Sequence, residues 1–306
     1  MRVIRNCSVE RTLAVIGDAW TFLVLREAYF KVRRFDQIQK ALQISRTTLT
    51  DRLATLVKSQ ILYRAPIGDG GRTEYRLTER GIDLYPVMLA LLRFGDDWLP
   101  GDPTRPLTLI HLSCGHECSP DTICSKCHGS VDALNVVYRD GPGAGTAACP
   151  AHRRRRILDS KVGGSRRPDS VARALSILSD RWTFLIIRET FFGVRRFDAF
   201  QDNLRIAPNI LADRLARLVE QKVLDRIGYQ TNPPRFEYKL TEVGRALYLP
   251  LIQMLRWGDK WAGFPPPLLL KHSACGHDFE PLIVCSHCRA PLNASDMTYS
   301  PNYRTA

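Results

Sequence analysis

The 306-residue chain has no apolar run that approaches the roughly 18 residues needed to cross a membrane. Its N-terminal stretch, MRVIRNCSVERT, lacks the apolar core of a signal peptide, which predicts a cytoplasmic protein. No phosphate-binding loop, nucleophile elbow or paired carboxylate motif is found, and these absences argue against an enzyme. Acidic residues are scarce: 31 Asp and Glu stand against 44 Lys and Arg, and the net charge of +13 favours nucleic acid as a partner before a membrane surface.

The chain contains an internal sequence repeat. The string WTFL at 20–23 returns at 182–185, VRRFD at 32–36 returns at 194–198, and DRLA at 51–54 returns at 213–216. These ordered matches predict a tandem duplication, with copy one at residues 1–138 and copy two at residues 169–306. The segment between them, 139–168, is rich in Gly, Pro and Arg, which is typical of a flexible linker. It carries eight basic and two acidic residues, so each copy is only mildly basic.

Each copy has the pattern of a winged helix-turn-helix domain. In copy one, apolar spacing predicts an amphipathic helix from Val9 to about Phe30 and a short helix over 35–42. A further helix follows Ser45, a preferred N-cap residue, and the two short helices form a helix-turn-helix pattern. Two β-type runs around GDGG predict the wing hairpin. The last helix, 81–98, has more apolar surface than a small domain covers, which predicts a dimer-type interface.

Each copy resembles the HxlR-type winged helix-turn-helix transcriptional regulators. The residues that carry the resemblance in copy one are Cys7 and Trp20 ahead of LREA, the RRFD string, LTDRL at 49–53, EYRLTERG at 74–81, and the helix to Trp98. The resemblance implies homodimers that bind pseudo-palindromic operators in the bacterial nucleoid, some of them responding to oxidants or electrophiles. Because the two halves are fused here, we expect an intrachain pseudo-dimer, with a further homodimer as the alternative.

Polar side chains at the start of each second helix are the candidates for reading bases, because the major groove admits a helix and displays a distinct pattern for each base pair. Basic residues nearby suit phosphates, and the alternative is a merely solvated face. Copy two is less polar here, with Ala207-Pro208-Asn209-Ile210, which predicts unequal half-sites and an asymmetric operator. Arg52 and Arg214 follow Asp51 and Asp213 and could equally form internal ion pairs. The predicted DNA-binding residues are Arg33, Arg34, Arg46, Thr47, Thr48, Thr50, Arg52, Arg72, Arg195, Arg196, Asn209, Arg214 and Arg235.

Each copy ends in a His-x-x-Cys pair followed by a Cys-x-x-Cys pair, the spacing of a tetrahedral structural zinc site. We predict one zinc site within each copy, with His116, His277 and Cys118 as alternative ligands and a metal-free hairpin as the competing interpretation. The predicted ligands are His111, Cys114, Cys124 and Cys127 in copy one and His272, Cys275, Cys285 and Cys288 in copy two.

Cys7 stands just before the first helix, where the resemblance implies an oxidant-sensing thiol in some members. A helix N-terminus together with Arg5 and Arg11 could activate it, and an inert half-buried thiol is the alternative. Copy two has Asp169 at this position, so such a switch would be one-sided. In the linker, we expect Cys149 to be exposed and Arg153–Arg156 to add a sequence-independent contact with phosphates.

The predicted fold is mainly α with small β wings (α+β). Its predicted parts are winged helix-turn-helix domains at 1–100 and 169–263, zinc-ribbon-like β modules at 101–138 and 264–306, and the linker at 139–168. The predicted function is sequence-specific binding of double-stranded DNA by a transcriptional regulator, with an oxidant or small-molecule effector as an option. The alternative is an adaptor that uses the same domains for protein contacts in the transcription machinery.

Overall fold

The computed structural model describes the chain except for residues 1–2, 17–18, 69–70, 149–167, 179 and 304–306. Cys149 and Arg153–Arg156 therefore lie outside the described residues. Within the described part, no helix is both long and apolar enough to cross a membrane.

The winged domain of copy one contains the predicted elements with two corrections. The last helix, predicted over 81–98, is divided into a short helix that ends at Ile82 and a longer one that begins at Tyr85. The single helix expected from Val9 to Phe30 is wrong, because these residues form two helices separated by a Gly-Asp pair in the sequence. In copy two the corresponding helices are also separate, and the Asp180 carboxylate begins the second of them by accepting from the backbone N–H groups of Trp182 and Thr183. The elements are α1 (Ser8–Ile16), α2 (Ala19–Tyr29), α3 (Phe35–Leu42), α4 (Arg46–Lys58), β2 (Leu62–Ile67), β3 (Arg72–Leu77), α5 (Glu79–Ile82) and α6 (Tyr85–Trp98).

Copy two repeats this order with a longer wing. Its elements are α7 (Ser170–Ile177), α8 (Arg181–Phe191), α9 (Phe197–Leu204), α10 (Pro208–Glu220), β9 (Leu224–Thr231), β10 (Pro234–Leu240), α11 (Glu242–Ala246) and α12 (Tyr248–Trp261). In both copies a leucine row on the second helix of the motif is fully buried, namely Leu49, Leu53 and Leu56 on α4 and Leu211, Leu215 and Leu218 on α10. This burial fixes which face of each helix is turned outward.

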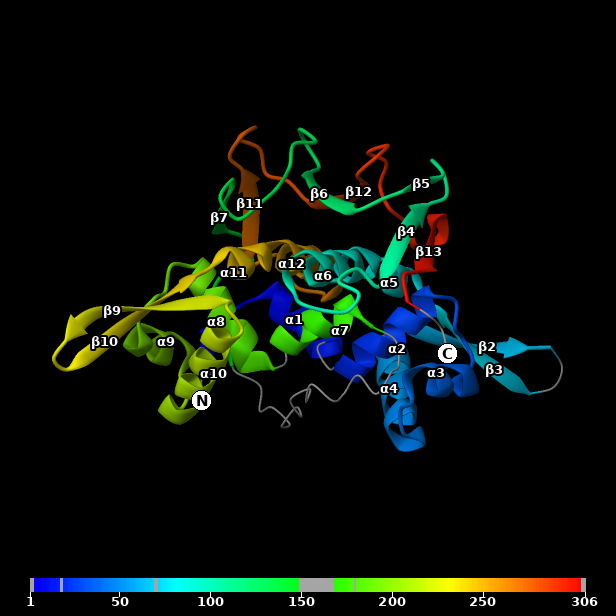
Figure 1. The fold of residues 1–306 in the computed structure, drawn as a ribbon, viewed down its shortest axis with the longest axis horizontal. Helices are drawn as coiled ribbons and strands as arrows, with labels where there is room; N and C mark the ends of the chain where they lie inside the picture. The colour runs from blue at the N-terminus through cyan, green and yellow to red at the C-terminus, as the bar shows by residue number, and fades with distance from the viewer. Residues whose placement is uncertain (1–2, 17–18, 69–70, 149–167, 179, 304–306) are drawn as a thin grey trace.

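The two copies pack into an intrachain pair. Helix α6 packs against α12, while α1 packs on α12 and α7 packs on α6, so each copy contributes its first helix to the other. The crossings are very close: a Cβ at Gly95 would overlap the Ser170 carbonyl, and one at Gly258 would overlap the Ser8 carbonyl. Only glycine permits this approach of two backbones. Figure 1 shows α6 and α12 through the centre, with the wings extending to opposite ends.

The C-terminal modules are interleaved, not separate. Strand β4 (Leu107–His111) pairs with β13 (Met297–Pro301) and with the short β5 (His116–Glu117). Strand β7 (Val136–Asp140) pairs with β11 (Leu268–His272), and β6 (Pro120–Cys124) pairs with β12 (Pro281–Cys285). In the last pair Thr122 lies opposite Ile283, its own counterpart in the repeat, so the pseudo-twofold axis passes between them. A short 3-10 helix, Ala294–Asp296, precedes β13.

The expected flexible linker is structured at its beginning. Arg139 and Asp140 belong to β7, and Thr146–Ala148 form β8, which pairs with β1 (Val3–Arg5). Close backbone contacts hold the turn between them, since the amides of Gly141 and Gly143 donate to the carbonyls of Pro267 and Pro266 at 3.0 and 2.9 Å. The first part of the connection, up to Gly143, therefore packs against copy two through these strand and turn contacts.

Candidate nucleic-acid interface and metal centres

Helix α4 begins with a cap that its own sequence supplies. The Ser45 hydroxyl accepts from the Thr48 backbone N–H at 3.2 Å and lies 2.8 Å from the Thr48 hydroxyl. The Thr50 hydroxyl donates to the Arg46 carbonyl at 2.9 Å, so Thr48 and Thr50 both have local partners. Arg46 and Thr47 are exposed at the helix start, with the Arg46 guanidinium 5.2 Å from the Phe35 ring. These two side chains are the most available for contact with a base edge.

Helix α10 presents a different surface. Pro208 stands in its first turn, and no side chain caps the N-terminus at Ala207. Ile210 packs partly against the core, whereas Asn209 is exposed. In Figure 1, α4 and α10 project from the same side of the molecule, opposite the interleaved modules. The two recognition helices are thus held on one face with unequal polar residues.

The basic residues divide into exposed and paired groups. Arg72, Arg195 and Arg235 are exposed. Surface ion pairs join Arg34 to Asp36 at 3.2 Å and Arg196 to Asp198 at 3.0 Å, and Arg33 lies 4.0 Å from Glu74. Such exposed pairs are weak enough for a phosphate to replace the carboxylate.

Arg214 differs from the other predicted DNA contacts. Its guanidinium binds Asp180 at 2.7 Å and also Asp213, and the side chain is mostly buried. Because Asp180 caps α8, this contact ties α10 to the helix behind it. Arg214 therefore forms the internal ion pair that was the alternative to DNA contact. Arg52, its counterpart in copy one, is half-buried and also has an interaction partner.

Two wing arginines were missed by the sequence reasoning. Arg64 on β2 and Arg226 on β9 are exposed at equivalent positions of the repeat, beside the rings of Tyr75 and Phe236. The distance from the Arg226 guanidinium carbon to the ring centroid is 3.5 Å. Their recurrence in both copies is the signal that could have found them.

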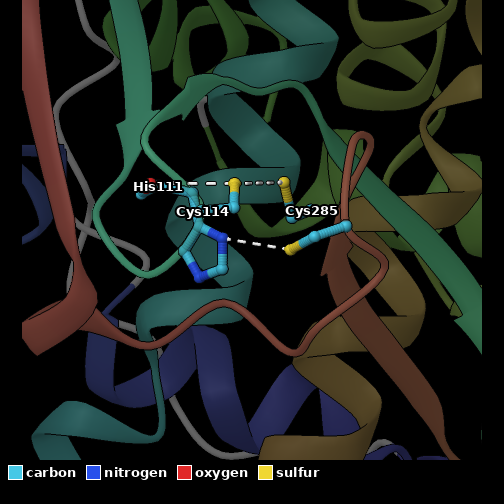
Figure 2. Close-up of side chains that lie close together, drawn as sticks. His111, Cys114 and Cys285 are labelled. Carbon is cyan, nitrogen blue, oxygen red and sulfur yellow. Dashed lines mark hydrogen bonds between the residues drawn. The ribbon is translucent and has the colours of Figure 1, made fainter.

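The first His/Cys cluster is built from both copies. His111 and Cys114 at the end of β4 meet Cys285 and Cys288 at the end of β12. The Cys114 and Cys285 sulfurs are 4.0 Å apart, and the His111 Nδ1 is 3.3 Å from the Cys288 sulfur. Figure 2 shows His111, Cys114 and Cys285 converging from opposite chain segments.

The second cluster is equivalent to the first, with the roles of the two copies exchanged. Cys124 and Cys127 of copy one meet His272 and Cys275 of copy two. The Cys124 and Cys275 sulfurs are 3.9 Å apart, and the His272 Nδ1 is 3.2 Å from Cys127 Sγ and 3.7 Å from Cys275 Sγ. The predicted grouping within each copy is therefore wrong, because the interleaved strands bring each His-x-x-Cys pair to the Cys-x-x-Cys pair of the other copy.

Both clusters have the dimensions of a tetrahedral metal site. Zinc bonds of about 2.3 Å to sulfur and about 2.0 Å to nitrogen place ligand sulfurs about 3.8 Å apart and sulfur and nitrogen about 3.5 Å apart. Cys124 and Cys285 also accept from the amides of Lys126 and His287, each at 3.4 Å, which orients the two sulfurs. The outer nitrogen of His111 lies 2.9 Å from Asp296, a carboxylate placed to hold the ring.

The alternative ligands lie at the edge of the clusters. His116 stacks on His287 at 3.7 Å between ring centroids, and both are exposed beside Cys114. Cys118 is buried, and burial raises the pKa of its thiol to about 12. His111 and His272, which are almost fully buried, are the histidines inside the two four-residue clusters.

Cys7 is buried where the two copies meet. Its carbonyl accepts from the Arg11 amide at the start of α1, and its thiol interacts with the buried guanidinium of Arg188 from copy two. The equivalent position in copy two is Asp169, which forms an ion pair with Arg26. A thiol and a carboxylate thus occupy matching places opposite matching arginines.

Two winged helix-turn-helix units with both recognition helices on one face define the molecule as a DNA-binding regulator in architecture. The chain belongs to the HxlR-like helix-turn-helix family, whose model matches residues 15–103 and 177–264, more than half of the chain. This membership confirms the predicted DNA-binding transcriptional regulator and does not favour the adaptor.

The chain is similar to several single-copy proteins. It is 43% identical over 135 residues to the uncharacterized HTH-type transcriptional regulator Rv3095 of Mycobacterium tuberculosis, covering 44% of this chain and 85% of the relative. It is 33% identical over 89 residues to the HTH-type transcriptional regulator YodB of Bacillus subtilis, covering 29% of this chain and 80% of YodB. Among solved structures, PA1607 is 34% identical, with 44% of this chain and 92% of that chain covered and a TM-score of 0.37.

Proposed function

We propose that this chain binds one asymmetric operator in double-stranded DNA and regulates transcription by occupying it, without catalysis. The observation that carries the proposal is the presence of two unequal recognition helices, α4 and α10, on the same face of one fused chain. Helices inserted into successive major grooves read bases, and the wings contact the backbone. Because the copies differ at these helices, the two half-sites differ in sequence.

The residues fall into three roles under this proposal. Arg46 and Thr47 on α4 and Asn209 on α10 read base edges, since they are exposed at the helix starts. Arg214 acts by positioning α10 through Asp180. The remaining predicted residues support the cap or contact phosphates, namely Arg33, Arg34, Thr48, Thr50, Arg52, Arg72, Arg195, Arg196 and Arg235, and the wing residues Arg64 and Arg226 join the phosphate group.

This proposal can be tested by footprinting. The DNA is a promoter-proximal fragment selected for binding to the protein. Arg46→Ala should weaken protection of one half-site, and Asn209→Ala should weaken protection of the other, because each side chain serves a single helix. Loss of one good base contact costs about 1–3 kcal/mol, or roughly 5- to 150-fold in affinity. Equal loss at both half-sites in each variant would contradict an asymmetric operator.

We further propose that the two His/Cys clusters hold structural zinc. The donor set, two buried histidines with six cysteines at tetrahedral spacing, supports zinc over calcium or magnesium, which prefer oxygen. Four protein ligands leave no open position for a substrate, so the ions are structural. Metal analysis of purified protein should give two zinc ions per chain, and less than one would contradict the proposal.

Cys7 is proposed as the site of an oxidant response. The guanidinium of Arg188 interacts with this thiol, and the family relative YodB has been crystallised after diamide treatment. Diamide should change operator affinity in the wild type and leave Cys7→Ser unaffected. If both proteins respond equally, Cys7 is the inert buried thiol of the alternative interpretation.

A further inference from the structure

The two halves of the molecule differ at one joint between the copies. On one side, Asp83 at the end of α5 closes the joint with three contacts from α12. Its carboxylate accepts from the Trp261 indole N–H at 2.7 Å, binds Arg256 at 3.1 Å and lies 3.4 Å from the Lys260 ammonium. This carboxylate therefore links the end of α5 in copy one to α12 in copy two.

The matching joint on the other side has no such carboxylate. The repeat replaces Asp83 by Ala246, Ile82 by Arg245 and Lys260 by Asp97, while Trp98 remains in the place of Trp261. Instead of a closed network, a groove of about 580 Å³ lies between α6 of copy one and α11 of copy two. Both Ala246 and Trp98 line it, so the groove lies at the position equivalent to the Asp83 network on the other side.

Two donors in this groove stand without a carboxylate. Trp98 is 40% exposed, and its indole N–H has no hydrogen bond within the part of the chain that the structure describes. Arg245 donates to the Leu240 carbonyl at 3.2 Å and has no acidic partner among those same residues. The apolar side chains of Ile123, Leu134 and Leu249 line the rest of the groove.

Two of the four acidic side chains that line the groove are paired with arginines. Asp97 pairs with Arg93 and Arg105, and Asp121 pairs with Arg93 and Arg289. The Asp132 carboxylate accepts from the amides of its own turn, which leaves Glu242, exposed in the first turn of α11. The groove therefore combines apolar walls with an indole and a guanidinium, both of which carry donors that a carboxylate can accept from.

We propose that this groove binds a small organic carboxylate with an aromatic-sized apolar body, whose carboxylate takes the place that Asp83 fills on the other side. The volume is in the range of ligand pockets. Since the ligand would touch α6 of one copy and α11 of the other, it would set the geometry between the recognition helices. That regulatory role rests on the proposed function, whereas binding itself does not.

Calorimetric titration with 1-naphthoate and with neutral 1-naphthalenemethanol tests the groove. The wild type should bind one naphthoate per chain, with the alcohol about tenfold weaker because a charged hydrogen bond is lost. Ala246→Asp supplies the missing carboxylate in place and should weaken naphthoate binding at least about tenfold. Arg245→Ile introduces the residue found at the equivalent position, Ile82, and should also weaken naphthoate binding. This variant replaces Ala246→Asp in the test if Ala246→Asp does not fold.

Ala144→Asp is the matched control, because it adds the same charge at an exposed position away from the groove. It should bind naphthoate as the wild type does. Undetectable binding at millimolar naphthoate, or equal affinity in the wild type and both groove variants, would overturn the proposal.

Operator affinity measured by fluorescence anisotropy separates this inference from the proposed function. Naphthoate should shift the operator Kd of the wild type and of Ala144→Asp, and should leave that of Ala246→Asp unchanged. An unshifted Kd despite calorimetric binding would overturn the regulatory role. Absence of any operator binding would instead contradict the proposed function, and calorimetry alone would then decide the groove.

Discussion

Pairs of cysteine substitutions distinguish metal sites shared between the copies from sites within each copy. Cys114→Ser combined with Cys285→Ser removes two ligands from one cluster and leaves the other intact. Cys114→Ser combined with Cys124→Ser removes one ligand from each cluster, although both residues belong to copy one. We expect the first pair to retain one zinc ion per chain and the second to retain none after dialysis against a chelator.

The size of this effect follows from the tetrahedral geometry. The serine hydroxyl that replaces a thiolate is a poor zinc ligand, so a cluster with three donors releases the ion under conditions in which the intact cluster holds it. Each occupied site stabilises the fold by about 4 kcal/mol when free zinc is about a thousandfold above its Kd. Loss of both ions should therefore lower the melting temperature more than loss of one.

Elemental analysis by mass spectrometry gives the zinc content, and Cys7→Ser should keep two ions per chain because Cys7 lies in neither cluster. The opposite pattern would refute the shared sites: one ion in the Cys114/Cys124 variant and none in the Cys114/Cys285 variant. That pattern is what sites confined to single copies require. Far-UV circular dichroism shows whether each double variant is folded when it is analysed.

Three further predictions concern the helix crossings between the copies and the DNA-binding surface. Gly95→Ala should destabilise the fold by about 1–3 kcal/mol in denaturant titrations, because its Cβ would overlap the Ser170 carbonyl, and no change would contradict that crossing. Burial raises the pKa of Asp96 and Asp259 to about 6 from 3.8, so the folded state binds protons more tightly and stability should increase as pH falls from 7 towards 5. Replacing both by Asn should flatten that part of the pH profile, and an unchanged slope would exclude these carboxyls as its source. Arg46→Ala should reduce operator affinity far more than binding to random DNA, measured by anisotropy with both duplexes, and equal losses would mark Arg46 as a phosphate contact.

The local elements could be predicted because their signals lie within a few residues. The helix over Phe35–Leu42 has the predicted bounds, and the Ser45 cap is present, since both depend on short-range spacing and one side-chain hydrogen bond. The first helix was predicted too long because the helical spacing of apolar residues continues from α1 into α2, so this spacing does not separate the two helices. Local patterns thus determined these elements but not every boundary.

The His-x-x-Cys and Cys-x-x-Cys pairs of the candidate metal sites could be found in the sequence, but the way they combine into clusters could not. Both copies have the same ligand spacing, so the sequence alone satisfies a pairing within a copy as well as one between copies. The choice depends on β6 pairing with β12 about the pseudo-twofold axis, which places the last residue of each strand opposite the first of the other. Cys124 and Cys285 are carried to opposite ends of that ribbon, and each meets the His-x-x-Cys pair of the other copy.

Fusion explains why the two halves of this regulator differ. In a homodimer, every substitution appears on both sides of the twofold axis, so a site made on one side is made on the other. In a fused chain, Asp83 closes one joint while Ala246 leaves the matching joint open, and Cys7 faces Arg188 while Asp169 faces Arg26. Each difference changes one half without altering the other. The symmetric His/Cys clusters and helix crossings join the two copies, so the remaining positions are free to become one-sided.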